Sequence, residues 1–282
     1  MSASTQTPGP KQKVAFRPHR RWYQRPDVVL PVALIAIGFS LLIAVDPQQQ
    51  FYSSEFTADP DQTFDTAWAL HLVPQMLVGL YILTRATVLA FLIAVTLGLV
   101  LALLRRSKTR LVSFPAAFVI EFIRSTPILV QFFFFQALVR TTPALSLSGV
   151  EVLVVVLGVH YATYASEAYR AGINSVDPGQ WEAATALNLS GWATWTTLII
   201  PQALPNALPA LGNYLIAAFK DAPIGGPVLG VTCMLFFANT LRSTDFRPVE
   251  PYLLIGVGFL LVSLPAAWAV RRLEAHIAYE RG

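Results

Sequence analysis

The side chains best suited to chemistry are charged residues that interrupt long apolar stretches. Lys220 and Asp221 end an uncharged run from Leu198, and Pro223 follows them. A charge inside a lipid bilayer costs roughly 2.5 to 3.5 kcal/mol, so such residues rarely lack a role. Two roles fit this pair equally well, a contact along a pathway for a polar solute and a salt bridge between helices. The proline predicts a helix break, whose free backbone groups must be buried in protein or line a cavity.

Two further pairs of opposite charge stand three residues apart, a spacing that lets side chains meet on a helix. Glu121 and Arg124 form one pair, and Glu167 and Arg170 form the other. We expect structural pairing from both, with the second bracing the segment that follows. The candidate contacts for a solute nevertheless include Arg124, Glu167 and the nearby Tyr164.

Several other kinds of chemistry find no support in the sequence. His160 has no second histidine at ligand spacing, so packing with a hydrogen bond is expected and a metal site is not. Cys233 is the one cysteine and is expected to be buried. No G-x-x-x-x-G-K-[ST] phosphate loop and no catalytic cluster occur, so the chain is expected to bind no cofactor and to be no enzyme. The phenylalanines at 132–135 fit core packing or lipid contact, with a hydrophobic gate as the alternative.

The composition favours a membrane protein over a soluble one. Apolar residues make up 55% of the 282 residues, and charged residues make up 13%, against about 25% in soluble domains. Basic residues lie beside apolar runs, which is typical of membrane topology and argues against nucleic-acid binding. The expected fold is all-α, a polytopic helical membrane protein with about six transmembrane helices, located in the bacterial inner membrane.

The apolar runs and their flanking charges divide the chain. The expected spans are Val28–Val45, Ala86–Leu104, Leu111–Val139, Val150–Tyr164, Leu198–Phe219 and Tyr252–Val270, with 224–238 as a re-entrant or interfacial helix. The expected regions are a disordered basic tail at 1–26, an additional helix at 27–45, a periplasmic linker at 46–74, a transmembrane domain at 75–275 and a tail at 276–282. With both termini in the cytoplasm, most of the 20 Lys and Arg lie inside.

A cytoplasmic loop at 166–200 carries helix signals of its own. Asp177 can cap a helix, Pro178 suits its first position, and Gln180 stands where a capping box places an amide. The pattern predicts a short helix from Pro178 to Asn188, a sharp turn at Gly191 and a second helix. A short exposed helix rich in small residues fits a groove on another protein.

This loop resembles the EAA loop of binding-protein-dependent ABC import permeases. The matching residues are Glu182, Ala183, Ala184, Gly191, Ile200, Leu204 and Pro205. Four more blocks, in the same order, are similar to the polar amino acid branch of that family: 121–131, 164–173, 200–205 and Lys220-Asp221. Together the similarity covers about residues 75 to 275.

The resemblance implies a five-helix permease core with one additional amino-terminal helix, coupled to a separate cytoplasmic ATPase dimer that uses ATP and Mg. The coupling contact is expected at Trp181, Glu182, Ala183, Ala184 and Gly191. A second permease, identical or paralogous, and an extracytoplasmic solute-binding protein are the other implied partners. The implied cargo is a polar amino acid or related small zwitterion, compatible solutes such as ectoine included.

The chain departs from the family pattern in its added first span and in the residues after Asp221. Relatives usually continue with hydroxyl residues, whereas Ala222, Pro223 and a Gly225-Gly226 pair stand here. A secondary transporter and a membrane-embedded enzyme are the rival functions. The former would bring paired broken helices, and neither rival explains the folded loop.

Overall fold

The computed structural model describes residues 58, 63–142 and 144–279. The first expected span and the amino-terminal tail therefore lie outside the described residues. The described chain is built from helices, in agreement with the expected all-α fold: α2 (Thr66–Arg105), α3 (Arg110–Ser125), α4 (Ile128–Thr141), α5 (Gly149–Asn174), α6 (Pro178–Ala186), α7 (Gly191–Ala193), the π-helical turn η2 (Thr194–Ile199), α8 (Ile200–Leu229), α9 (Met234–Thr244) and α10 (Val249–Tyr279).

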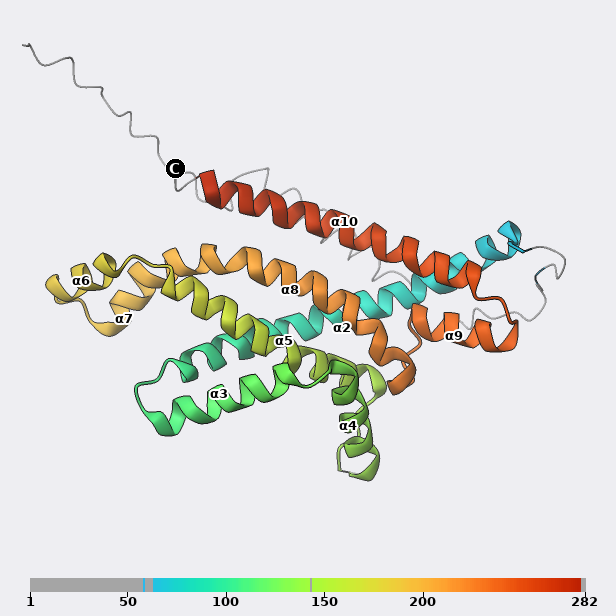
Figure 1. Cartoon of the computed structure of the whole chain (residues 1–282), viewed down its shortest axis with the longest axis horizontal. Helices are drawn as coiled ribbons and strands as arrows, with labels where there is room; N and C mark the ends of the chain where they lie inside the picture. Colours follow the sequence, from blue (N-terminus) through green and yellow to red (C-terminus); the bar gives the residue numbers. More distant parts are fainter. Residues whose placement is uncertain (1–57, 59–62, 143, 280–282) are drawn as a thin grey trace, which may run out of the picture.

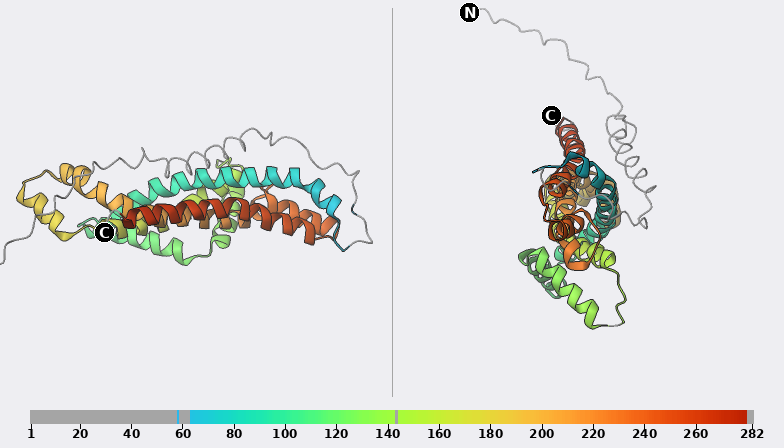
Figure 2. Two further views of the ribbon diagram at one scale, coloured as in Figure 1. Left: turned by 90° about the horizontal axis from the view of Figure 1, so that it is seen from above. Right: turned by 90° about the vertical axis from the view of Figure 1, so that its right-hand side faces the viewer.

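The long helices form a bundle with α5 at its centre. Helix α5 packs along both α2 and α8, and α10 contacts α8, α2 and α9. Figure 1 shows α6 and α7 together at one end of this bundle and α9 at the other, with α4 projecting from its side. The views in Figure 2 show the same elongated arrangement, with α2 and α10 running along its length.

Five membrane spans can be drawn from the described residues. Three helices, α2, α5 and α10, are long and apolar enough to cross by themselves, and two bent pairs qualify when each is taken as one span. The bend is 105° between α3 and α4 and 49° between the α7–α8 segment and α9. The protein is therefore a helical membrane protein, and the sixth expected span falls outside the described residues.

Helices α2 and α5 approach closely because α2 carries a small residue at every fourth position. The series is Ala86, Ala90, Ala94, Gly98 and Ala102, all buried. A Cβ at Gly98 would lie 2.9 Å from the Ala162 backbone oxygen and 2.7 Å from the Ala165 Cβ of α5. Small residues four apart allow such contact between membrane helices. The α2–α5 contact thus depends on the absence of a side chain at Gly98.

A Gly98→Leu substitution should consequently destabilise the bundle. Overpacking costs about 1 to 3 kcal/mol, which corresponds to a fall of roughly 5 °C in melting temperature for a protein of this size. Thermal unfolding of the detergent-purified permease, followed by circular dichroism, measures the effect. Gly256→Leu in α10 is the matched control, because a Cβ there meets nothing within 4 Å. Equal melting temperatures for the two variants would contradict this account of the packing.

Helix α2 begins at Thr66, twenty residues before the expected start of the second span at Ala86. The Asp65 side chain accepts a hydrogen bond from the Trp68 backbone nitrogen (3.0 Å) and caps the helix. Trp68 and Leu72 are both buried in the core, so packing extends the helix through a polar stretch. At 1.5 Å per residue the 40-residue helix is about 60 Å long, well beyond the hydrocarbon thickness of about 30 Å.

The expected helix stop after Phe219 is wrong. Helix α8 continues through Lys220, Asp221 and Pro223 and ends at Gly230, whose φ of 70° is left-handed. Lys220 is exposed, and the Asp221 carboxylate accepts a hydrogen bond from a tyrosine of α5. Both charges are therefore accommodated without ending the helix. The segment expected to be re-entrant divides between the end of α8 and α9.

The real helix break lies at Thr126-Pro127, inside what was expected to be one span. Proline disfavours helical backbone in the residue before it, and Thr126 is extended, with φ of −97° and ψ of 127°. Helix α5, by contrast, continues ten residues past Tyr164, to Asn174. The last span, α10, begins at Val249, close to its expected start at Tyr252.

Candidate functional site

The loop helix predicted at Pro178 is present as α6. The Asp177 carboxylate accepts from the Gly179 backbone nitrogen (2.6 Å), and Pro178 occupies the first helical position, both as expected. The expected capping box does not form, because the Gln180 Oε1 instead accepts from Gln202 Nε2 of α8 (3.3 Å). This contact attaches the first turn of α6 to the start of α8.

The turn after α6 lies at Asn188 rather than at Gly191. Asn188 has a φ of 51°, and asparagine tolerates this left-handed conformation better than most residues. Gly191 instead begins α7, which Ser190 caps by accepting from the Ala193 backbone nitrogen (3.2 Å). The expectation of two short helices joined by a sharp turn holds, with the turn placed three residues earlier.

Helix α6 has one packed face and one exposed face. Ala184 is buried, and the Trp181 ring packs edge-on against Trp195 of η2, with ring centroids 5.5 Å apart. Glu182 and Ala183 are exposed. Trp181 and Ala184 therefore hold the helix to its own chain, while Glu182 and Ala183 are available to another protein.

Arg106, at the end of α2, joins α6 to the bundle. Its guanidinium lies 5.3 Å from the centre of the Trp181 ring and 5.7 Å from that of Trp195. Its Nη1 also donates to the Asn174 Oδ1 of α5 (3.1 Å). Cation–π contacts of this kind contribute about 0.5 to 2 kcal/mol each. From the sequence alone, Arg106 indicates only the membrane topology, because its partners lie 68 to 89 residues away and no local pattern points to them.

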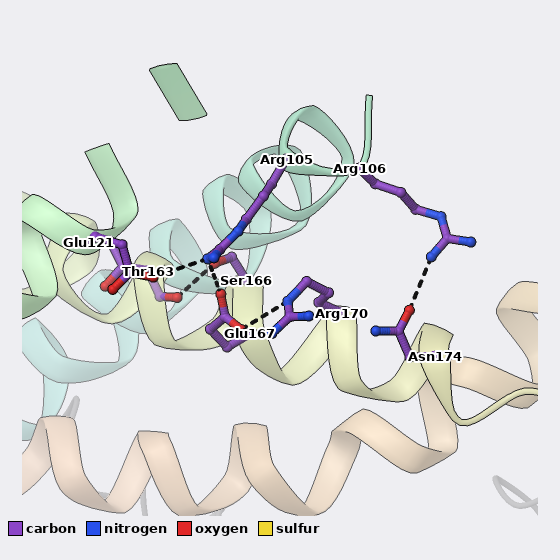
Figure 3. Close-up of polar contacts among 8 residues, drawn as sticks. All are labelled: Arg105, Arg106, Glu121, Thr163, Ser166, Glu167, Arg170 and Asn174. Carbon is purple, nitrogen blue, oxygen red and sulfur yellow. Dashed lines mark hydrogen bonds and ion pairs between the residues drawn. The ribbon is translucent and has the colours of Figure 1, made fainter. Parts of the chain in front are cut away.

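A network of charged residues joins α2, α3 and α5 at the same end of the bundle (Figure 3). The Glu167 carboxylate accepts from Arg105 of α2 and from Arg170 of its own helix, the latter at 2.6 Å. The expected Glu167–Arg170 pair is thus confirmed. Arg105 Nη1 also lies 3.4 Å from Glu121 Oε1 of α3, so the expected Glu121–Arg124 pair is wrong. With two arginine partners, Glu167 braces α5 against α2.

Arg124 takes part in a different group, which we call the polar cluster: Arg124, Gln131, His160, Tyr161, Tyr164, Tyr214 and Asp221. The Arg124 guanidinium lies 5.1 Å from the centre of the Tyr164 ring. Its Nε is buried, with no hydrogen-bond acceptor among the described residues. A buried arginine nitrogen without an acceptor is costly to leave unpaired, which makes it the strongest indication of a ligand in this region.

Three tyrosines extend the polar cluster from Arg124 to α8. The Tyr164 ring contacts those of Tyr161 (5.7 Å between centroids) and Tyr214 (5.6 Å). The Tyr161 hydroxyl donates to Asp221 Oδ2 (2.7 Å). Lys220 makes none of the ion pairs found in the described part of the chain. Of the five predicted pathway residues, Arg124, Tyr164 and Asp221 thus join one cluster, while Glu167 and Lys220 do not.

Gln131 secures the helix break that shapes this cluster. Its Nε2 donates to the backbone oxygens of Ile123 (2.9 Å) and Thr126 (3.0 Å), on the amino-terminal side of the break. It also lies 3.1 Å from His160 Nδ1, so the expected packed, hydrogen-bonded histidine is confirmed. The sequence placed Gln131 in a motif without assigning a role. Sequence reasoning missed Tyr161, although it stands three residues before Tyr164, and it missed Tyr214, which contacts Tyr164 from another helix.

Comparison with known proteins identifies the family. Residues 94–279 match the model of the binding-protein-dependent transport system inner membrane component. The chain is 38% identical to a probable amino-acid ABC transporter permease of Sinorhizobium fredii, over 76% of this chain and 94% of that protein. The chain is a binding-protein-dependent ABC importer permease. This permease belongs to the polar amino acid branch.

Other relatives agree with this assignment. The permease is 33% identical to the L-cystine transport permease TcyL of Bacillus subtilis, over 71% of this chain and 84% of that protein. A crystal structure of an amino acid ABC transporter with histidines superposes with a TM-score of 0.70 at 32% identity, covering 76% of this chain and all of that one. A chain of the MetNI methionine ABC transporter, in an inward-facing conformation, shares the fold, with a TM-score of 0.62 at 16% identity. As in the family generally, an ATPase on a separate chain and a substrate-binding protein complete the transporter, and the permease is not an enzyme.

Proposed function

We propose that this permease imports a polar amino acid or a related small zwitterion, with compatible solutes such as ectoine in the same class, and that the solute passes the polar cluster. The observation that carries the proposal is the buried Arg124 Nε, which lacks an acceptor while Asp221 lies across the tyrosines from it. A zwitterion supplies a carboxylate for Arg124 and a cationic group for Asp221. The names of the amino acid relatives support the same cargo class.

Each part of the polar cluster has a role in this proposal. Arg124 would hold the solute carboxylate, since guanidinium binds carboxylates through two parallel hydrogen bonds. The amino-terminal end of α4, which begins at Ile128 just beyond the break, adds its positive dipole end. Asp221 would accept the solute ammonium, and the Tyr164 ring offers its face to a cation. Glu167 and Lys220 are left out, since one is braced by arginines and the other is exposed.

The exposed side of α6 would be the contact with the ATPase. In this scheme Glu182 and Ala183 dock into a cleft on the ATPase dimer, while Trp181 and Ala184 hold α6 rigid. Arg106 carries the movement of α6 to α2 and α5. ATP and Mg act on the ATPase, a second permease copy or paralogue completes the pathway, and α6 with both termini lies in the cytoplasm. A secondary transporter would have no use for this exposed, capped helix.

Competition for uptake tests the proposed cargo. The permease is reconstituted in proteoliposomes with its ATPase and solute-binding protein, and uptake of a labelled polar amino acid is measured. Amino acids and ectoine should compete, whereas matched compounds that lack either the carboxylate or the cationic group should not, because both Arg124 and Asp221 need a partner. Equal competition by simple amines would refute the zwitterion proposal.

A further inference from the structure

A pocket with a volume of about 690 Å³ lies where α2 turns into α3. Its lining includes Arg105 and Arg110, together with apolar side chains such as Leu111, Phe114 and Pro115. The lining, all of it within the described part of the chain, includes no Asp or Glu. The pocket therefore combines positive charge with an apolar wall, and it is separate from the polar cluster.

The charge available to a ligand comes from Arg110, which lines the pocket, and from Lys108, which stands two residues before it in the α2–α3 turn, outside the lining. Both are exposed, and neither forms an ion pair with any described residue, whereas Arg105 is held by Glu121 and Glu167. Arg106 is directed to the tryptophans of α6 and η2. A cluster of four or more Lys and Arg directly beside a membrane helix is typical of sites for anionic lipid headgroups.

An apolar track leads away from the pocket along α3. Leu111, Phe114, Phe118 and Phe122 recur at helical spacing and are 87%, 73%, 61% and 62% exposed. Phe118 and Phe122 stack with centroids 6.0 Å apart. The 16 residues of α3 span about 24 Å, more than the roughly 15 Å of one hydrocarbon leaflet. Since α3 is half of a bent pair able to cross the membrane, this track is suited to an acyl chain.

We propose that the pocket at the α2–α3 turn binds an anionic phospholipid, with its phosphate at Lys108 and Arg110 and an acyl chain along Phe114, Phe118 and Phe122. A zwitterionic lipid is a weaker ligand, because its ammonium would meet arginine and no carboxylate. The six Lys and Arg among residues 1–26 would be repelled by Lys108 and Arg110, so this basic stretch of the permease is a poor match for the same site. A soluble protein could contact Lys108 and Arg110, but it would leave the apolar track of α3 exposed.

Retention of phosphatidylglycerol tests the site. Full-length permease in nanodiscs of phosphatidylcholine is titrated with phosphatidylglycerol, and bound lipid is counted by native mass spectrometry after release. Near an anionic headgroup each Lys or Arg contributes about 1 kcal/mol, so the double variant Lys108→Gln, Arg110→Gln should bind about 30-fold more weakly. The matched control is Arg271→Gln, Arg272→Gln, which removes two exposed basic residues of α10 and should bind like wild type.

A second pair of variants tests the apolar track along α3. Phe114→Ala should weaken retention several-fold, whereas Phe134→Ala, which removes a phenyl of α4 that is 63% exposed, should leave it unchanged. Glycerol 3-phosphate, a headgroup without chains, should not displace the lipid. Equal retention by all variants, or full displacement by glycerol 3-phosphate, would overturn the proposal. Because no ATP, partner or solute is present, a negative result here leaves the importer function standing, and a failure of uptake leaves the lipid site standing.

Discussion

Reversing the charge of Glu182 should abolish energy coupling while leaving the permease folded. Glu182 is exposed on the free face of α6, opposite the packed Trp181 and Ala184. Like charges juxtaposed across an interface cost several kcal/mol, and 1.4 kcal/mol is tenfold in affinity. We therefore expect Glu182→Arg to weaken ATPase association at least about 100-fold. Uptake should fall at least tenfold, measured in proteoliposomes alongside copurification of the ATPase.

The control for this variant is Glu274→Arg, another exposed helical glutamate, on α10. It should retain ATPase binding and uptake, and both variants should show wild-type circular dichroism and elution volume. Wild-type uptake by Glu182→Arg would show that the exposed face of α6 does not contact the ATPase. Loss of uptake with ATPase association intact would place the role of Glu182 in transmission instead of docking.

Arg124→Ala should separate solute binding from ATPase assembly. Removing one partner of a buried, hydrogen-bonded charge pair costs about 2 to 5 kcal/mol, which is at least about 30-fold in affinity. Solute binding to the permease–ATPase complex, measured by equilibrium dialysis without the binding protein, should weaken by that factor, and uptake should fall with it. ATPase association should be unchanged, because Arg124 contacts Tyr164 and not α6.

Two variants control this result. Arg124→Lys should recover only part of the affinity, because an ammonium is a point charge that cannot pair with both carboxylate oxygens in the fixed geometry of arginine. Arg140→Ala, at the exposed end of α4, should behave like wild type. If Arg124→Ala binds solute normally, the unpaired Nε serves packing alone and the solute passes elsewhere.

The features that could be predicted from the sequence are those with local causes. Asp177 and Pro178 define the start of α6 because capping and the first-turn preference of proline act within three residues. The Glu167–Arg170 pair likewise follows from spacing on one helix. Apolar composition alone established the membrane class. These local signals were enough to place the loop helix and its exposed glutamate.

The features that could not be predicted depend on residues far apart in the chain. Glu121 pairs with Arg105 of α2 rather than with its helical neighbour Arg124, and only the α2–α3 packing decides between them. Pro223 predicts an early end of α8, whereas the helix continues to Leu229 and Asp221 is held by Tyr161 from another helix. Tertiary contacts thus override local propensity at both places.

ATP-dependent uptake is the most direct test of the central claim, that this permease is driven by a separate ATPase. Proteoliposomes containing the permease, its ATPase and its solute-binding protein are loaded with ATP and Mg, with a non-hydrolysable analogue, or with no nucleotide. The account predicts uptake of a labelled polar amino acid only with ATP. Equal uptake without nucleotide, or uptake driven by an ion gradient alone, would contradict it and indicate a secondary carrier.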